Sequence, residues 1–191
     1  MEQKQLMEQH IIHYTWLLSN KKKWCYIKKD ANYLIFSFFI ISVFCWILEV
    51  IYSLIDRAKL VYPGSWYGPY CPIYGLTFVL LILIINKKKN FFINIIKTFI
   101  TVIVMEYIIA FISEELFDKR IWDYTHDFLN INGRVCLKMS IIFTILGLFL
   151  VYVVEPIIKK IYLHFSKKAI IFNIIFLIVF TIDVSLTFIN K

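Results

Sequence analysis

Five long apolar runs dominate the sequence, and they constrain its fold more than any other feature. A helix needs about 20 mostly apolar residues to cross roughly 30 Å of bilayer hydrocarbon. None of the runs alternates between apolar and polar residues, as the strands of a membrane β-barrel do. The sequence therefore predicts an all-α protein, a polytopic transmembrane helix bundle of about five spans. The spans are expected at residues 33–56, 72–86, 91–113, 135–155 and 169–189, of which 72–86 is the shortest.

The composition agrees with a lipid environment. Hydrophobic residues make up 60% of the 191 residues, and the mean hydropathy is +0.72. Soluble domains are roughly 45–50% apolar. A soluble domain of this length could not bury so much apolar surface, so the sequence predicts that lipid surrounds much of the chain.

Lysines are clustered between the apolar runs. Because positive charge beside a span tends to stay in the cytoplasm, the clusters at residues 21–29, 87–89 and 159–168 predict cytoplasmic segments. In loops 57–71 and 114–134 acidic residues dilute the basic ones, and these loops are predicted to lie outside. We expect a multi-pass protein of the plasma membrane with a cytoplasmic N-terminus. Since the net charge of +8 follows the loops rather than one basic face, a nucleic-acid partner is not indicated.

The chain is expected to form one helical bundle, residues 33–191, preceded by a cytoplasmic segment, residues 1–32. Apolar residues among polar neighbours in the first 20 positions predict an amphipathic helix on the inner leaflet. A partly ordered tail that ends in a lysine cluster explains the same residues. The basic start has no small-residue cleavage site, so we expect no removable signal peptide.

Proline and glycine gather in and beside the two outward loops. The run Tyr67–Gly75 contains Pro69 and Pro72, which remove backbone donors and restrict the residues before them. Irregular backbone at membrane depth survives only where protein or trapped water satisfies its polar groups. The run therefore indicates either a covered pocket, with Tyr70 and Tyr74 as candidate binding residues, or a plain interfacial turn.

The second outward loop is rich in hydrogen-bonding side chains. Such a density of polar groups fits contacts with a polar ligand. Alternatively, the aromatic residues anchor the loop at the headgroups and the asparagine-rich turn caps the fourth helix. The candidate residues are Trp122, Asp123, Tyr124, Asn130, Asn132 and Arg134.

Three acidic residues of the first and third predicted spans and their ends are candidates for a site: Glu49, Glu106 and Glu114. An unpaired carboxylate at the centre of a span costs at least about 2.5–3.5 kcal/mol on insertion scales, so each residue needs a partner or a proton. Glu106 lies near the middle of the third span with no obvious partner, whereas Arg57, Arg134 and Lys138 are within plausible reach of Glu49 and Glu114. Glu106 and Glu114 share a broad helix face, which we expect to look into the bundle. For Glu114, an interfacial charge facing water is the alternative.

Other residues are expected to be ordinary. Asp183, near the outer end of the fifth span, should reach the interface, and Glu155 with Pro156 should close the fourth helix. Cys71 and Cys136 are both on the predicted outer side, where a disulfide or two free thiols are the alternatives. The cysteines show no CxxC spacing and no histidine partners, so no metal site and no cofactor are predicted.

Matches to a known family are spread over positions 35–160. They are Trp46 with Glu49, the Tyr67–Gly75 run, Glu106-Tyr107 followed by Glu114, Trp122-Asp123-Tyr124, Asn130–Arg134 with Cys136, and Pro156. On these residues the sequence resembles the small bacterial membrane proteins labelled putative ABC transporter permeases of type IV. It departs from the family pattern at Cys45, where glycine is usual, and at Thr125-His126. The resemblance implies a role in transport.

The sequence itself has no means of using ATP. It contains no GxxxxGK[ST] run and no soluble portion large enough for an ATPase, so ATP-driven transport would need a separate ATPase subunit. Membrane lipids and a second copy of the chain are the other expected partners.

Three functions remain open on these residues. The first is a permease or transporter component with an outward-side polar pocket for a small solute. The second is a membrane-embedded enzyme acting on a lipid or lipid-linked substrate, with Glu106 or Asp123 as acid or base. The third is a non-catalytic accessory subunit. The candidate substrate-binding residues are Glu49, Tyr70, Tyr74, Glu106, Glu114, Trp122, Asp123, Tyr124, Asn130, Asn132 and Arg134.

Overall fold

The computed structural model describes residues 30–57, 67–118 and 120–189. Most of the predicted cytoplasmic segment 1–32, and residues 58–66 of the first outward loop, lie outside the described residues.

Helices account for the secondary structure of the described residues, apart from one isolated bridge between Ile131 and Val135. The all-α prediction is therefore confirmed. The helices follow one another as α2 (Ala31–Arg57), α3 (Pro72–Ile84), α4 (Phe91–Phe117), α5 (Leu137–Phe149), the π-helix η1 (Leu150–Val154), α6 (Glu155–His164) and α7 (Ser166–Ile189).

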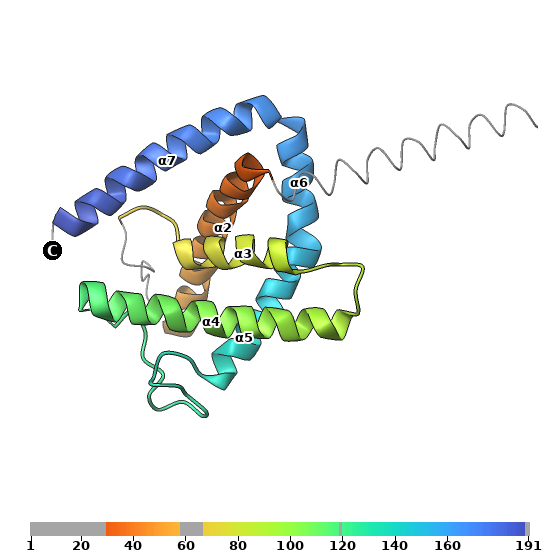
Figure 1. Cartoon of the computed structure of the whole chain (residues 1–191). Coiled ribbons are helices and arrows are strands. Elements are labelled where there is room, and N and C mark those ends of the chain that lie inside the picture. The colour runs from red at the N-terminus through yellow and green to blue at the C-terminus, as the bar shows by residue number, and fades with distance from the viewer. Residues whose placement is uncertain (1–29, 58–66, 119, 190–191) are drawn as a thin grey trace, which may run out of the picture.

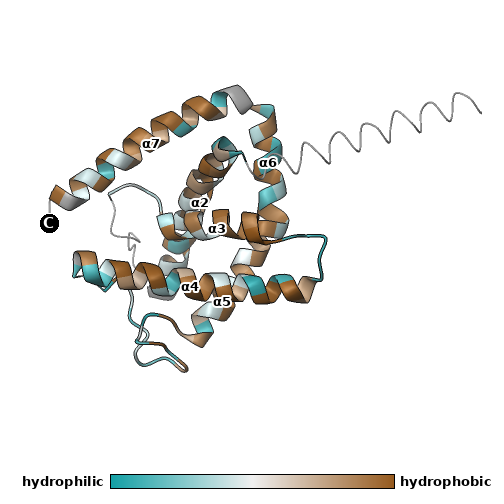
Figure 2. Ribbon diagram, in the orientation of Figure 1, coloured by the Kyte–Doolittle hydropathy of each residue, from teal (hydrophilic) through white to brown (hydrophobic). Residues whose placement is uncertain are grey.

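Four of the helical segments are long and apolar enough to cross a membrane. α3 is a shorter apolar helix and corresponds to the shortest predicted span. Many large apolar side chains are exposed, and Figure 2 shows that hydrophobic residues, in brown, predominate along α4 and α7. A multi-pass membrane protein of about five helices is therefore confirmed. The four long segments are Ala31–Ile55, Phe91–Leu116, Leu137–His164 and Lys168–Thr187.

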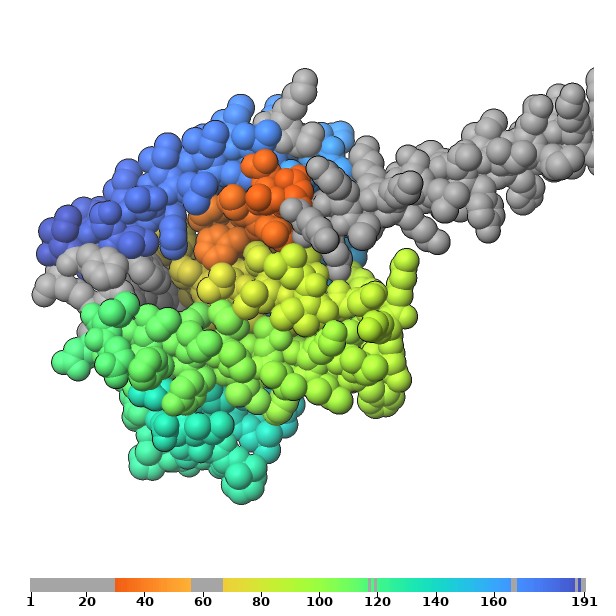
Figure 3. Space-filling model, in the orientation of Figure 1, coloured from red at the N-terminus to blue at the C-terminus, as the bar shows by residue number. Residues whose placement is uncertain are grey.

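The helices form a crossed bundle rather than a parallel one (Figure 1). α3 and α4 lie alongside one another and cross α2 and the rod formed by α5, η1 and α6. α7 turns back after α6 and packs against α2. Figure 3 shows α4 across the front of the molecule with α7 above it. The loop 120–136 lies at the opposite end of α4 from the α3–α4 turn.

α2 and α3 approach each other closely because Gly75 has no side chain. A Cβ at this position would lie 2.2 Å from the Ser42 hydroxyl oxygen and 2.5 Å from the Phe38 carbonyl oxygen. The N–H of Cys71 donates to the Ser42 carbonyl oxygen at 3.0 Å, so the start of α3 is fixed to the middle of α2. Small residues allow this approach between membrane helices. The contact sets the depth at which α3 begins.

The prediction that Glu155 and Pro156 close the fourth helix is wrong. The chain continues from α5 through η1 into α6, so one helical segment runs over Leu137–His164. Proline lacks an N–H and its ring clashes with the carbonyl group four residues earlier, which disrupts a regular helix. Here a single π-turn absorbs the disruption, because the N–H of Glu155 bonds the Leu150 carbonyl oxygen five residues back.

A polar cluster fastens the other end of the bundle, beside the α3–α4 turn. Glu155 is 3% exposed, and its carboxylate accepts from Lys87 at 2.8 Å and from the Tyr33 hydroxyl at 3.3 Å. The Asn94 amide donates to the Tyr152 hydroxyl at 2.8 Å. These bonds join four helical elements, so the position of Glu155 after the π-turn is a structural feature of the fold.

Candidate functional site

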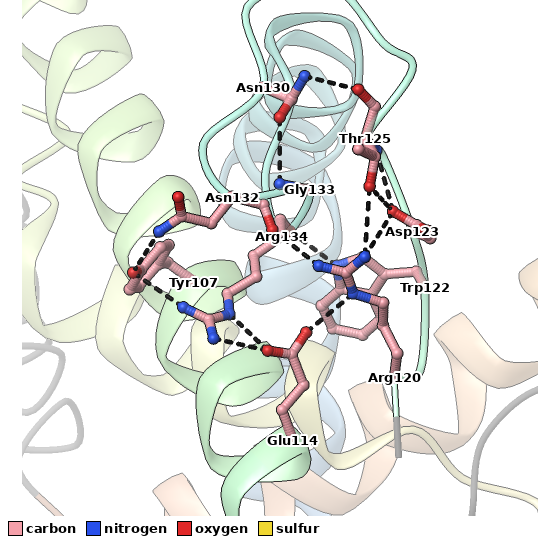
Figure 4. A network of polar contacts seen from close by, with 10 residues as sticks. All are labelled: Tyr107, Glu114, Arg120, Trp122, Asp123, Thr125, Asn130, Asn132, Gly133 and Arg134. Atoms are coloured by element: carbon pink, nitrogen blue, oxygen red, sulfur yellow. Dashed lines mark hydrogen bonds and ion pairs between the residues drawn. The ribbon is translucent and has the colours of Figure 1, made fainter. Parts of the chain in front are cut away.

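The loop after α4 is held against α4 by ion pairs centred on Glu114 (Figure 4). Arg134 donates to one Glu114 oxygen from Nε at 2.8 Å and from Nη2 at 2.6 Å. Arg120 Nε donates to the other oxygen at 3.0 Å. Of the three cations expected within reach of Glu114, Arg134 is therefore the one that pairs with it. The sequence analysis missed Arg120, because a single arginine in a mixed-charge loop has no distinguishing pattern.

Arg134 also reaches the aromatic face of α4. Its Nη1 donates to the Tyr107 hydroxyl at 3.0 Å, and its guanidinium lies 5.2 Å from the Tyr107 ring centre and 5.1 Å from that of Phe111. Asn132 donates to the same hydroxyl at 3.3 Å. The hydrogen bonds to Glu114 raise the pKa of Arg134. Arg134 therefore has a fixed position, and its positive charge is paired with the carboxylate of Glu114.

The backbone of this loop is folded on itself. The N–H of Tyr124 donates to the Gly133 carbonyl oxygen at 2.8 Å, and the Trp122 indole donates to the Arg134 carbonyl oxygen at 2.8 Å. Asn130 uses its amide to bond two loop carbonyl groups and accepts from the N–H of Gly133. Gly133 has φ +69°, where a Cβ would be strained. Trp122 and Asn130 thus shape the loop.

Asp123 is neutralised within the loop. Its carboxylate forms an ion pair with Arg120 at 3.0 Å and accepts hydrogen bonds from both the hydroxyl and the N–H of Thr125. These Thr125 bonds, followed by the charge of Arg120, lower the pKa of Asp123. We call the interacting residues Tyr107, Glu114, Arg120, Trp122, Asp123, Thr125, Asn130, Asn132, Gly133 and Arg134 the outer network.

A second group lies where α2, α3, α4 and the loop meet, and we call it the deep cluster: Glu49, Cys71, Tyr74, Glu106 and Tyr124. The Cys71 thiol donates to a Glu49 carboxylate oxygen at 3.3 Å. Tyr74 is close enough to Glu49, Cys71 and Tyr124 to interact electrostatically with each. Burial and the charge of Glu106 raise the pKa of Tyr124. The run Tyr67–Gly75 and the second loop therefore meet at the same end of the bundle.

Glu106 is the unusual member of the deep cluster. Its side chain is 3% exposed, and the Tyr124 hydroxyl approaches it. Neither carboxylate oxygen completes a hydrogen bond. Buried polar atoms are nearly always paired, and a carboxyl group left without partners has a large desolvation cost. Glu106 therefore has two buried carboxylate oxygens that are free to accept hydrogen bonds.

The described residues offer no cation and no metal set to this cluster. Among the ion pairs formed within ranges 30–57, 67–118 and 120–189, none includes Glu49 or Glu106. No three described histidine, cysteine or acidic side chains are placed to hold a metal ion. Cys71 and Cys136 are buried and are not joined by a disulfide.

Asp183 has a role that the sequence analysis missed. It is 6% exposed and accepts from the N–H groups of Tyr67 and Gly68, each at 3.1 Å, and from the Tyr70 hydroxyl. The expectation that Asp183 simply reaches the interface is wrong, because α7 packs over the turn before α3. Tyr70 consequently binds α7. The four predicted residues that come together in the deep cluster are Glu49, Tyr74, Glu106 and Tyr124.

Comparison with known proteins gives one match. The sequence profile of the family described as "Putative ABC-transporter type IV" matches residues 36–188. No curated protein and no solved structure matches the chain significantly.

Proposed function

Because this chain belongs to the "Putative ABC-transporter type IV" family, we propose that it is the membrane subunit of an ATP-driven transporter and that a small polar solute passes through its deep cluster. The chain contributes the path through the membrane. A separate ATPase subunit supplies the energy, since no nucleotide-binding run occurs in the sequence.

The observation that carries this proposal is the unpaired carboxyl group of Glu106. Holding a carboxylate within a spanning helix costs at least about 2.5–3.5 kcal/mol, and the described residues do not offset this cost with an ion pair. A purely structural role would be served as well by an apolar residue. Intramembrane acids that face the interior of a bundle commonly mark solute or ion pathways. A transiently bound solute gives Glu106 the partner that it lacks.

The outer network supports the deep cluster by holding the loop that carries Tyr124 over it. The ion pairs of Glu114 with Arg134 and Arg120 hold the loop on α4. The backbone bond from Tyr124 to Gly133 then keeps the Tyr124 side chain facing Glu106. In this proposal the loop covers the outward end of the path, and the Glu114 ion pairs hold the loop closed against α4.

Orientation in the membrane follows from the lysine distribution. The α3–α4 turn carries Lys87, Lys88 and Lys89, and positive charge beside a span favours the cytoplasm. We propose that this turn faces the cytoplasm and the outer network faces outward. Single cysteines at Lys88 and at Asp127, in an otherwise cysteine-free chain, test this with a membrane-impermeant thiol reagent. Labelling of the Asp127 site alone in intact cells is expected, and the reverse pattern contradicts the orientation.

Co-purification tests the subunit role most directly. The tagged chain is extracted from its native membrane in mild detergent, and the eluate is assayed for ATP hydrolysis and for a protein that carries a GxxxxGK[ST] sequence. A stoichiometric ATPase is expected. An eluate with no ATPase, combined with altered lipid composition in a deletion strain, would instead favour a membrane-embedded enzyme.

The path is tested in vesicles that contain the chain and its ATPase. Glu106→Gln preserves the size of the side chain and removes its ability to become negative, so ATP-driven solute flux should fall about tenfold or more. Glu115→Gln is the matched control, because Glu115 is exposed on the same helix. Equal flux in the wild type and in Glu106→Gln would remove Glu106 from the path.

A further inference from the structure

The described acidic side chains within or beside the membrane divide into two groups. Five of those outside the deep cluster have a donor or a cation: Asp30 binds the Tyr162 hydroxyl, Glu114 binds two arginines, Asp123 binds Arg120, Glu155 binds Lys87 and Asp183 binds the turn before α3. The remaining described acids outside the cluster are Glu115 and Asp118, which are exposed, and Asp127, which is half-buried in the loop. In the deep cluster Glu49 has only a thiol donor, and Glu106 completes no hydrogen bond.

This division has an electrostatic consequence. The two arginines of the loop, Arg120 and Arg134, form their ion pairs within the outer network, so neither neutralises the deep cluster. Two carboxyl groups at the junction of α2, α3 and α4 then create a site whose missing component is positive charge. An anionic solute would add repulsion to a site that already lacks cations.

We infer that the deep cluster binds a small protonated amine, with Glu106 and Glu49 accepting N–H hydrogen bonds from its ammonium group. The inference rests on the proposed transport function and names the solute class that the same site would carry. Glu106 offers two oxygens without partners, and an ammonium group has up to three N–H donors. The rings of Tyr74 and Tyr124 favour a cation at the same place.

Other cations fit these side chains less well. A metal ion would need several oxygen, nitrogen or sulfur ligands at short range, and no three described side chains are so placed. A quaternary ammonium ion has no N–H donor, so it would leave the oxygens of Glu106 without hydrogen bonds. The unfilled acceptors therefore select an amine that carries N–H groups.

Binding should release a proton. In the empty site none of the ion pairs among the described residues includes Glu106, and an acid inside a membrane span needs a partner or a proton. When an ammonium ion binds, the carboxyl proton leaves to solvent and a carboxylate–ammonium pair forms, which conserves charge. Tyr124 from the loop faces Glu106, and the titratable groups around them are Cys45 and Glu49 from α2, Cys71 and Tyr74 from the start of α3 and Cys136 before α5.

Calorimetry on the full chain in lipid nanodiscs tests the inference. Ethylammonium is titrated in two buffers of different ionisation enthalpy, phosphate and MOPS, so that proton release is measured as well as affinity. Tetramethylammonium and acetate are the comparison probes. We expect ethylammonium to bind with proton release, tetramethylammonium to bind about tenfold or more weakly, and acetate not to bind.

Two variants make the test specific. Glu106→Gln should lower ethylammonium affinity about tenfold or more and abolish proton release, whereas Glu115→Gln should change neither. Circular dichroism and size exclusion establish that Glu106→Gln is folded, and Glu49→Gln, with a smaller expected loss of affinity, provides a second variant of the site.

The inference is overturned if tetramethylammonium binds as well as ethylammonium, if acetate binds, if Glu106→Gln binds like the wild type, or if no amine binds. Co-purification with an ATPase is independent of all four results. An ATPase subunit that co-purifies with a chain that binds no amine would leave the transport proposal in place and remove only the amine as solute.

Discussion

Replacement of Asp183 tests how the last helix is joined to the rest of the bundle. The Asp183 carboxylate accepts from the N–H groups of Tyr67 and Gly68 at 3.1 Å and from the Tyr70 hydroxyl. Asp183→Ala leaves three donors without this partner. Asp183→Asn keeps one acceptor oxygen but turns an NH₂ group toward donors.

The magnitude follows from the burial of these donors. A buried donor without a partner costs about 1–3 kcal/mol. The bond from the Tyr70 hydroxyl is buried, whereas the two backbone bonds are partly buried, so water replaces part of their energy. We expect Asp183→Ala to lower the free energy of unfolding by about 2–4 kcal/mol and Asp183→Asn by about half of that. For a chain of this length the larger change corresponds to a fall in Tm of roughly 5–15 °C.

Thermal unfolding in detergent, followed by far-ultraviolet circular dichroism, measures the effect. Ser185→Ala is the matched control, because the Ser185 hydroxyl is on the exposed side of the same helix and bonds only within it. Tyr70→Phe should cost less than Asp183→Ala and should be non-additive with it, since both changes remove one shared bond. If Asp183→Ala unfolds at the same temperature as Ser185→Ala, Asp183 does not hold the turn before α3 in place.

Three further outcomes are expected. Gly75→Ala would place a Cβ 2.5 Å from a backbone oxygen of α2, so it should separate α2 from α3 and lower Tm strongly; an unchanged Tm would contradict the close approach. Because the Thr125 hydrogen bonds lower the pKa of Asp123 in the folded state, their stabilisation is present above the ordinary Asp pKa of about 3.9 and is lost as pH falls through the folded value. Acidification should therefore lower Tm less in Asp123→Asn than in the wild type, and parallel pH profiles would disprove this. Arg134→Lys keeps the charge but cannot grip Glu114 with two nitrogens, so loop amides should exchange hydrogen faster than in the wild type; equal exchange would show that charge alone fastens the loop.

The sequence alone determined the membrane character, the helical class and the approximate spans. These features depend on local properties of the sequence, namely the length of an apolar run and the position of lysines beside it. Neither property depends on how distant segments pack. The sequence also indicated the family, and it singled out Glu106 as a candidate residue, because an acid in the middle of an apolar run is costly wherever the helix packs. It named Arg134 as one of three cations within reach of Glu114, and the structure selected it.

Only the tertiary structure decided which polar residues share a site. The sequence grouped Glu49, Asp123, Asn130 and Arg134 as candidates of one kind, yet Glu49 lies in the deep cluster and the other three belong to the outer network. Asp183 was misjudged because its partners lie more than 110 residues earlier in the chain. Helix periodicity fixes which residues share a face, but crossing angles and close approaches decide which faces meet, and these depend on packing between distant segments.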